Sequence, residues 1–303
     1  MNRLQANLCL LCVTLFWSSE VIIYSCIPEG VPAFATTCVT ALIGAALLAA
    51  PFHRRVLDAL RAGGVRLVLA GLGLAALNSS YNTLYLFGMK SLDVASSAFT
   101  LSMTVVVLPV VLLSMHRRVA ARTWVSVALV LSGIVLALGK SAMVSANAPA
   151  LGIIVGGCLL RAVMIVLLAD IVKKHDPLVV TVLFEMFVVP LSLIGWFFED
   201  PRLFAGLHLS RTLVSAWALY AYFIVAFATT LNTFSMRRVS ATNATVIYSM
   251  EIVFSLAWGA LLPGGIVERI AITPRIAIGA VLVVAGALAE IFNMGGKRKE
   301  AQA

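Results

Sequence analysis

The chain has 303 residues, of which 61% are hydrophobic and only 12% are charged, and its net charge is +9. Soluble domains carry about 25% charged and about 45–50% apolar residues, so this composition excludes an ordinary soluble domain and indicates a protein embedded in lipid. A helix needs about 20 mainly apolar residues to cross the hydrocarbon core of a bilayer. The sequence predicts ten such spans, at 7–26, 32–51, 66–89, 92–115, 123–140, 149–172, 177–198, 211–235, 240–262 and 272–292.

The first span is predicted to be a retained helix rather than a cleaved signal, because no small-x-small cleavage site follows its apolar run. The segments between the ten spans are short. They leave no room for a soluble catalytic domain, and we therefore expect no enzymatic activity.

The basic charge is distributed unevenly over the predicted loops. If the N-terminus lies in the cytoplasm, 15 of the 22 Lys and Arg residues fall in cytoplasmic segments, six fall outside, and Arg161 alone lies within a span. This is the positive-inside pattern, with both termini in the cytoplasm. The charge is therefore explained by topology, and we expect no nucleic-acid partner.

Motifs for cofactors and metals are weak. Cys9 and Cys12 have C-x-x-C spacing but lie in an apolar helix without a second ligand pair, and all four His fall in predicted loops. The glycine-rich stretch from Gly133 to Ser141 has five residues between its glycines, where a phosphate-binding loop has four, and it precedes no soluble helix. We expect no metal site, no cofactor and no ATP-driven pumping.

The two halves of the chain carry an internal repeat. Residues 83–90, TLYLFGMK, align with residues 230–237, TLNTFSMR, and nearby shifts superpose Pro32 on Pro177 and Gly133 on Gly286. The period is about half the chain and contains five spans, and an odd number forces the two copies into opposite orientations across the membrane. Inverted repeats typify secondary transporters, whose binding site lies near the midplane between the halves. The predicted units are 1–145, 146–292 and a cytoplasmic tail at 293–303.

One stripe of polar residues follows the third predicted span. Asn78, Tyr81, Asn82 and Tyr85 lie at i, i+3, i+4 and i+7, on a single helix face. Aromatic rings beside amides suit an organic solute in a cavity. A helix–helix seam held by amide hydrogen bonds is the alternative for the same stripe.

Two other spans combine aromatic residues with an acid. In the first span Trp17, Glu20 and Tyr24 share a face, and in the ninth Tyr248 and Glu251 are followed by Ser255 and Trp258. We expect both faces to line a substrate pathway.

The seventh and eighth spans also present polar faces. Thr181, Glu185 and Ser192 align in the seventh, and the eighth offers Tyr222, Thr229 and Thr233 on one face with Asn232 beside it.

The predicted membrane interior thus holds Arg161 and the carboxylates of Glu20, Glu185 and Glu251. A charge at the bilayer centre costs about 2.5–3.5 kcal/mol on insertion scales, so such groups usually face a partner or a water-filled cavity. If Arg161 pairs with one acid, the other two remain to exchange protons or bind a cation. Which acid pairs with Arg161 stays open, as does a role for Arg161 in binding a substrate carboxylate.

The chain resembles the ten-helix, EamA-type branch of the drug/metabolite transporter (DMT) superfamily. The resemblance rests on Trp17 at the end of the first apolar run, the run SLDVASS at 91–97, the run YSME at 248–251, and the small residues around Gly279 and Gly286. It implies an all-α integral membrane fold of ten helices in two inverted five-helix repeats, with the fifth and tenth helices at the periphery. It also implies transport of small metabolites or drugs.

The sequence therefore predicts a secondary transporter in the cell (inner) membrane of a prokaryote, moving a small organic metabolite outward, with an amino-acid-like zwitterion favoured and proton coupling left open. An exporter of organic cations is one alternative, and a membrane signalling or scaffold protein that transports nothing is another. The expected partners are the substrate and the lipid bilayer, with monomer and homodimer both open. The predicted substrate-binding residues are Trp17, Glu20, Asn78, Tyr81, Asn82, Tyr85, Arg161, Glu185, Asn232, Tyr248, Glu251 and Trp258.

Overall fold

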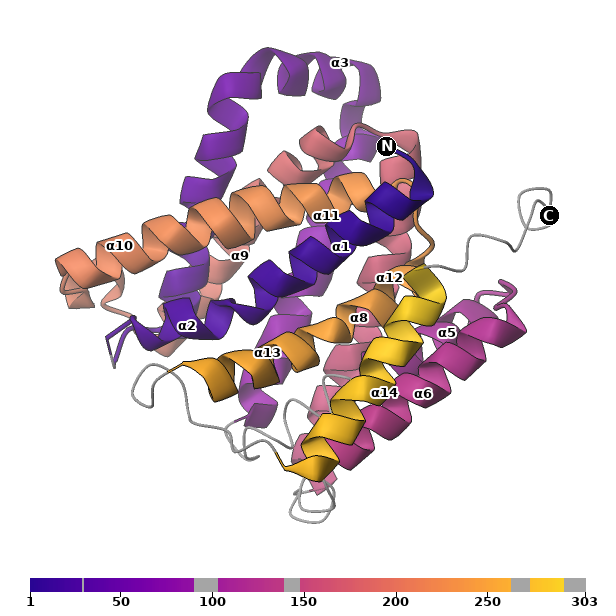
Figure 1. Ribbon diagram of the computed structural model, residues 1–303. Helices are drawn as coiled ribbons and strands as arrows, with labels where there is room; N and C mark the ends of the chain where they lie inside the picture. The colour runs from indigo at the N-terminus through magenta and orange to yellow at the C-terminus, as the bar shows by residue number, and fades with distance from the viewer. Residues whose placement is uncertain (29, 90–102, 139–147, 263–272, 292–303) are drawn as a thin grey trace.

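The computed structural model describes residues 1–28, 30–89, 103–138, 148–262 and 273–291, and these are built almost entirely from helices, with no strand among them. Figure 1 shows the helices gathered into one bundle. In chain order the elements are α1 (Arg3–Ser18), α2 (Glu20–Ser25), α3 (Ala33–Met89), α5 (Thr104–Ser114), α6 (Ala121–Leu138), α8 (Ala148–Lys174), α9 (Pro177–Glu199), η1 (Leu203–Gly206), α10 (Arg211–Tyr220), η2 (Ala221–Ala228), α11 (Thr229–Met236), α12 (Ala241–Tyr248), α13 (Met250–Leu261) and α14 (Pro274–Ile291).

The long helices have the length and composition of membrane spans. Large apolar side chains lie exposed on their outer faces, among them Phe198, Val281 and Leu69, as expected where lipid replaces water. The prediction of an all-α membrane protein is therefore confirmed. Among the described residues, five helical segments are long and apolar enough to cross a bilayer, namely Ala33–Leu84, Val155–Lys174, Pro177–Glu199, Arg211–Met236 and Ala241–Leu261.

Helix α3 corrects one predicted loop. Its 57 residues would measure about 86 Å if straight, far more than the roughly 30 Å of a hydrocarbon core. The backbone leaves the helical region at Phe52, next to Pro51, and at Gly64, whose φ is +54°. Figure 1 shows α3 rising, crossing and descending as an arch. The segment between the predicted spans 32–51 and 66–89 is therefore helical, and glycine permits the left-handed backbone at the second bend.

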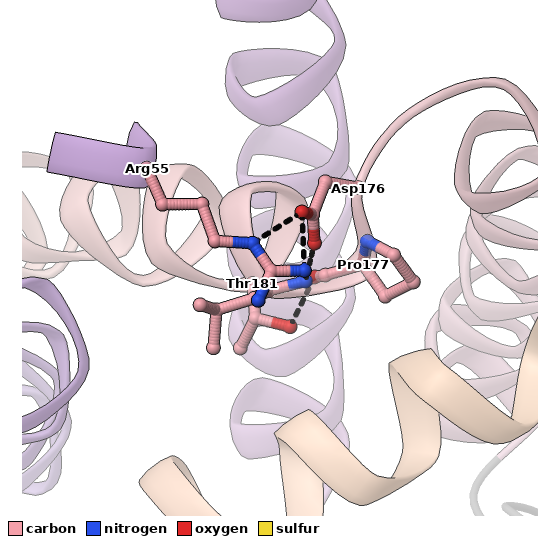
Figure 2. A network of polar contacts seen from close by, with 5 residues as sticks. Arg55, Asp176, Pro177 and Thr181 are labelled. Carbon is pink, nitrogen blue, oxygen red and sulfur yellow. Dashed lines mark hydrogen bonds and ion pairs between the residues drawn. The ribbon is translucent and has the colours of Figure 1, made fainter. Parts of the chain in front are cut away.

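The first arm of α3 runs antiparallel to α9. At one end the Glu199 carboxylate accepts hydrogen bonds from the backbone N–H groups of Ala33 (3.2 Å) and Phe34 (3.0 Å), which satisfies donors in the first turn of α3. At the other end Arg55 contacts Asp176 at 2.6 Å (Figure 2). Asp176 also caps the start of α9, because its carboxylate accepts from the N–H of Leu178. The two helices are thus fastened at both ends.

Glycines bring α6 and α14 into close contact (Figure 1). A Cβ atom on Gly133 would lie 2.5 Å from the carbonyl oxygen of Gly279, and one on Gly286 would lie 2.9 Å from that of Ser126. Earlier residues of α6 therefore contact later residues of α14, which means that the two helices run antiparallel. Small residues allow backbones to approach in this way.

Three predicted spans are less regular than expected. The first is divided at Ser19 into α1 and α2, and the ninth is divided at Ser249 into α12 and α13. The eighth contains the π-helix η2, which begins at Ala221 and ends at Ala228. The fourth predicted span is described only from Met103, so the run at 91–97 lies outside the described residues.

Candidate functional site

Serine side chains explain where two of the helices are interrupted. The hydroxyl of Ser19 donates to the carbonyl of Phe16 at 2.7 Å, and that of Ser249 donates to the carbonyl of Val246 at 2.5 Å. Such bonds compete with the helical ladder and bend helices. The N–H groups of both serines bond to these same carbonyls, three residues back, in the tighter 3₁₀ pattern. Glu20 and Glu251 follow these two breaks directly, at the start of α2 and of α13.

Arg161 on α8 lies beside Glu251. One guanidinium nitrogen is 3.9 Å from a Glu251 carboxylate oxygen, and another donates to the Tyr81 hydroxyl at 3.4 Å. The guanidinium carbon is also 5.4 Å from the centroid of the Tyr81 ring, within cation–π range. The side chains of Arg161 and Glu251 are 16% and 30% exposed. This is a loose ion pair, and it identifies Glu251 as the acid that pairs with Arg161.

Glu20 lies in the same electrostatic neighbourhood. It interacts at longer range with both Glu251 and Arg161, and its carboxylate accepts a hydrogen bond of 2.6 Å from the Tyr220 hydroxyl. Sequence reasoning missed Tyr220 and placed Tyr222, which is 55% exposed, on the polar face of the eighth span. The reason is η2: its i→i+5 hydrogen bonds turn the chain less per residue than an α-helix does. A helix face read at α-helical spacing is therefore not continuous through residues 221–228.

Aromatic side chains close around these charges. The rings of Trp17 and Tyr248 are 5.3 Å apart, and the Tyr248 hydroxyl donates to the side-chain oxygen of Asn232. The indole N–H of Trp258 donates to the Ser18 hydroxyl at 3.0 Å, which ties α13 to the end of α1. We call the following residues the Arg161 cluster: Trp17, Glu20, Tyr81, Arg161, Tyr220, Asn232, Tyr248, Glu251 and Trp258.

The remaining predicted residues lie apart from these contacts. Asn78 and Asn82 on α3 are half-buried, and among the described residues their amides find no hydrogen-bond partner. Glu185 is 5% exposed on α9 and contacts no member of the Arg161 cluster through a hydrogen bond or ion pair. The side chains of Tyr24 and Tyr85 lie outside the described residues.

A surface cavity lies beside an ion pair of α8. This cavity of about 170 Å³ lies beside Arg117, which is paired with Asp170 on α8. No group of three or more His, Cys, Asp or Glu side chains suited to a metal ion occurs within the described ranges.

Comparison with known proteins finds a similar structure and a family match. One crystal structure shares 18% sequence identity with the chain, covers 95% of this chain and 98% of its own, and superposes with a TM-score of 0.73, which shows a common fold. No curated protein matches the chain. Residues 4–139 match the EamA-like transporter family, which indicates a transporter rather than an enzyme. This family of membrane transporters belongs to the DMT superfamily, and the match covers most of the first half of the chain.

Proposed function

We propose that the protein is a secondary transporter that exports a small zwitterionic metabolite, such as an amino acid, across the inner membrane of a prokaryote. In this proposal ten helices form two inverted repeats, 1–145 and 146–292, and both termini and the tail at 293–303 lie in the cytoplasm. The antiparallel pairing of the first arm of α3 with α9, and of α6 with α14, supports the inversion. These pairs are the second and the fifth spans of each half, and corresponding helices of inverted repeats run in opposite directions.

The observation that carries the proposal is the loose pair of Arg161 and Glu251. Their separation of 3.9 Å is longer than a charge-assisted hydrogen bond of about 2.7–2.9 Å. A substrate carboxylate that forms two parallel hydrogen bonds with the guanidinium is therefore a better partner for Arg161 than Glu251 is.

The two acids provide the complementary half of the site. Once Glu251 releases Arg161, Glu251 and Glu20 together offer two carboxylates to a substrate ammonium group. The rings of Trp17 and Tyr248 supply an apolar surface for the rest of the solute. One positive and two negative groups fit the two charges of a zwitterion, which in this proposal is exported in exchange for protons. The proposal holds for a monomer and for a homodimer.

Export of organic cations is a second candidate, and one observation favours it. Two acids and one Arg leave the Arg161 cluster with an excess negative charge, and the cluster contains five aromatic residues, namely Trp17, Tyr81, Tyr220, Tyr248 and Trp258. A cation held over an aromatic face beside a carboxylate is a stable arrangement. In that case Arg161 neutralises Glu251 and does not touch the solute.

An exchange assay in proteoliposomes tests these candidates. Vesicles loaded with unlabelled amino acids or organic cations are diluted into the labelled solute, and uptake by exchange is measured without an ion gradient. We expect amino-acid exchange, reduced at least about a hundredfold in Arg161→Met because a bidentate charged contact is lost. The surface variant Arg202→Met is the matched control and should exchange normally. Exchange of cations alone would support the second candidate, and no exchange of any solute would support a non-transporting protein.

A further inference from the structure

Glu185 is a buried acid on α9. It lies eight residues into α9, about 12 Å from the start of the helix, and it is 5% exposed. Neither a hydrogen bond nor an ion pair joins it to any described residue. Gly71 of α3 packs against Leu183 so closely that a Cβ there would lie 2.8 Å from the Leu183 Cβ. Helix α3 therefore packs closely against α9 at Leu183, two residues before Glu185.

A second unsatisfied polar group lies at the same level of the bundle. Thr181 on α9 donates to the Thr233 hydroxyl on α11 at 3.0 Å, which fixes the register of the two helices. Glu185 is one turn further along α9, and Thr230 is one turn back along α11 on the face of Thr233. Because α9 and α11 run antiparallel, both positions lie on the same side of the Thr181–Thr233 contact. The Thr230 hydroxyl is buried and has no hydrogen-bond partner among the described residues.

Among the described residues, no charged group on a neighbouring element offsets a negative charge on Glu185. Helix α9 packs on α3, α8 and α11, and α11 contains no titratable residue. Arg161 contacts both Tyr81 and Glu251, and Asp170 is paired with Arg117. No described charge has a resolved electrostatic effect on Glu185. On the buried or half-buried faces of α3 and α8, the described titratable side chains are Cys38, Tyr81, Cys158, Arg161 and Asp170.

We propose that Glu185 is the site that carries the coupling proton, and that its protonated carboxyl donates a hydrogen bond to the Thr230 hydroxyl. An ionised carboxylate buried without a partner is strongly disfavoured, whereas the protonated group is neutral and gains one O–H donor. Glu20 and Glu251, the other two acids that the sequence leaves open for this role, already have partners in Tyr220 and Arg161. The inference rests on the proposed transport function and assigns its coupling to a separate residue.

Helix α11 connects this proton site to the Arg161 cluster. Thr233 faces α9, while the adjacent Asn232 accepts the hydroxyl of Tyr248, whose ring lies against Trp17. The π-helix η2 precedes α11 directly, and the Thr229 hydroxyl bonds back to the carbonyl of Ile224, five residues earlier. π-helical turns are points where a helix can change register. A proton that draws Thr230 toward Glu185 would therefore shift Asn232 and, through Tyr248, the substrate side chains.

The test separates coupling from transport in proteoliposomes prepared without sodium. Each variant is assayed for solute exchange without a gradient and for accumulation driven by a pH gradient. We expect Glu185→Gln, which mimics the protonated group, to exchange within about twofold of the wild type but to lose at least about tenfold in gradient-driven accumulation. Glu185→Asp should retain accumulation, and Thr230→Val should lower it several-fold. Ser192→Ala, on the same buried face of α9, is the matched control and should leave both assays unchanged.

The outcomes are distinguishable. Accumulation that persists in Glu185→Gln, or that follows a sodium gradient rather than a pH gradient, would overturn the proton site while leaving transport intact. Absence of exchange in the wild type would overturn the proposed function itself. If Glu185→Gln does not fold, the Thr230→Val variant tests the proposal. Normal pH-driven accumulation in Thr230→Val would contradict the proposed hydrogen bond.

Discussion

Two regions of this bundle bury the same side chain in opposite ways. In the Arg161 cluster, Glu20 and Glu251 receive partners from α10 and α8, and aromatic rings close around them. On α9, Glu185 is more deeply buried than Glu251 and has no hydrogen-bonding or charged partner among the described residues. The difference shows that burial alone does not define the role of an intramembrane acid.

The energetics of the two regions differ for the same reason. A buried ion pair is costly to break by removing one partner, because the other charge is left uncompensated. An isolated buried acid avoids that cost by remaining protonated and is therefore suited to gain and lose one proton. The paired acids are suited to bind a charged solute. The isolated acid is suited to bind and release a proton.

The largest expected effect comes from breaking the Arg161–Glu251 pair. Arg161→Met leaves Glu251 buried without its cation and should destabilise the folded protein by about 3–5 kcal/mol. Arg161→Met combined with Glu251→Gln removes both charges and should recover most of that loss. Folded yield and thermal midpoint in detergent measure the effect.

The control for this cycle comes from the other region. Arg161→Met combined with Glu185→Gln should remain as unstable as Arg161→Met alone, because Glu185 is not paired with Arg161. If stability recovered in this double variant and not in the one with Glu251→Gln, then Glu185 rather than Glu251 would be the partner of Arg161.

A smaller effect is expected when Glu20 loses its hydrogen bond. Tyr220→Phe removes the hydroxyl that donates to Glu20 at 2.6 Å, and a hydrogen bond to a charged group contributes about 1.5–3 kcal/mol. Glu20 would then resemble Glu185, and we expect weaker substrate binding in a direct binding assay. Tyr222→Phe, two residues away and 55% exposed, should bind normally. Equal losses in the two variants would contradict the assignment of Tyr220 to the site.

The smallest effect is expected outside the membrane, in the segment after α9. The side chain and backbone of Arg202 donate to Asp200 and hold the pKa of that carboxyl below its ordinary value of 3.8. This pair therefore stabilises the fold fully above pH 3.8, and the contribution is lost as the pH falls through the lowered folded-state pKa. Asp200→Asn should lower the thermal midpoint slightly at pH 7, and the difference should vanish in strong acid. A gap that widens as the pH falls would contradict this sign.

Several features of the fold were predictable because they depend on local chemistry. Long apolar segments identify membrane helices, since the bilayer requires about 20 apolar residues in each span. Gly133, Gly279 and Gly286 entered the sequence analysis through the repeat and the family resemblance, and α6 and α14 meet at these glycines. The cost of burying Arg161 made it a candidate site residue from the sequence alone.

Other features were decided by the tertiary structure. The sequence left three acids as partners for Arg161, and only the packing of α8 against its neighbours brings Glu251 within 3.9 Å. Tyr220 replaced Tyr222 because η2 alters the rotation of the helix, and the arch of α3 turned a predicted loop into helix. The hydrophobicity and charge of each segment determine which segments enter the membrane and which side chains are costly there. Pairing depends on distances of a few ångströms between residues far apart in the chain, such as Arg161 and Glu251, and those distances are set only when the helices pack.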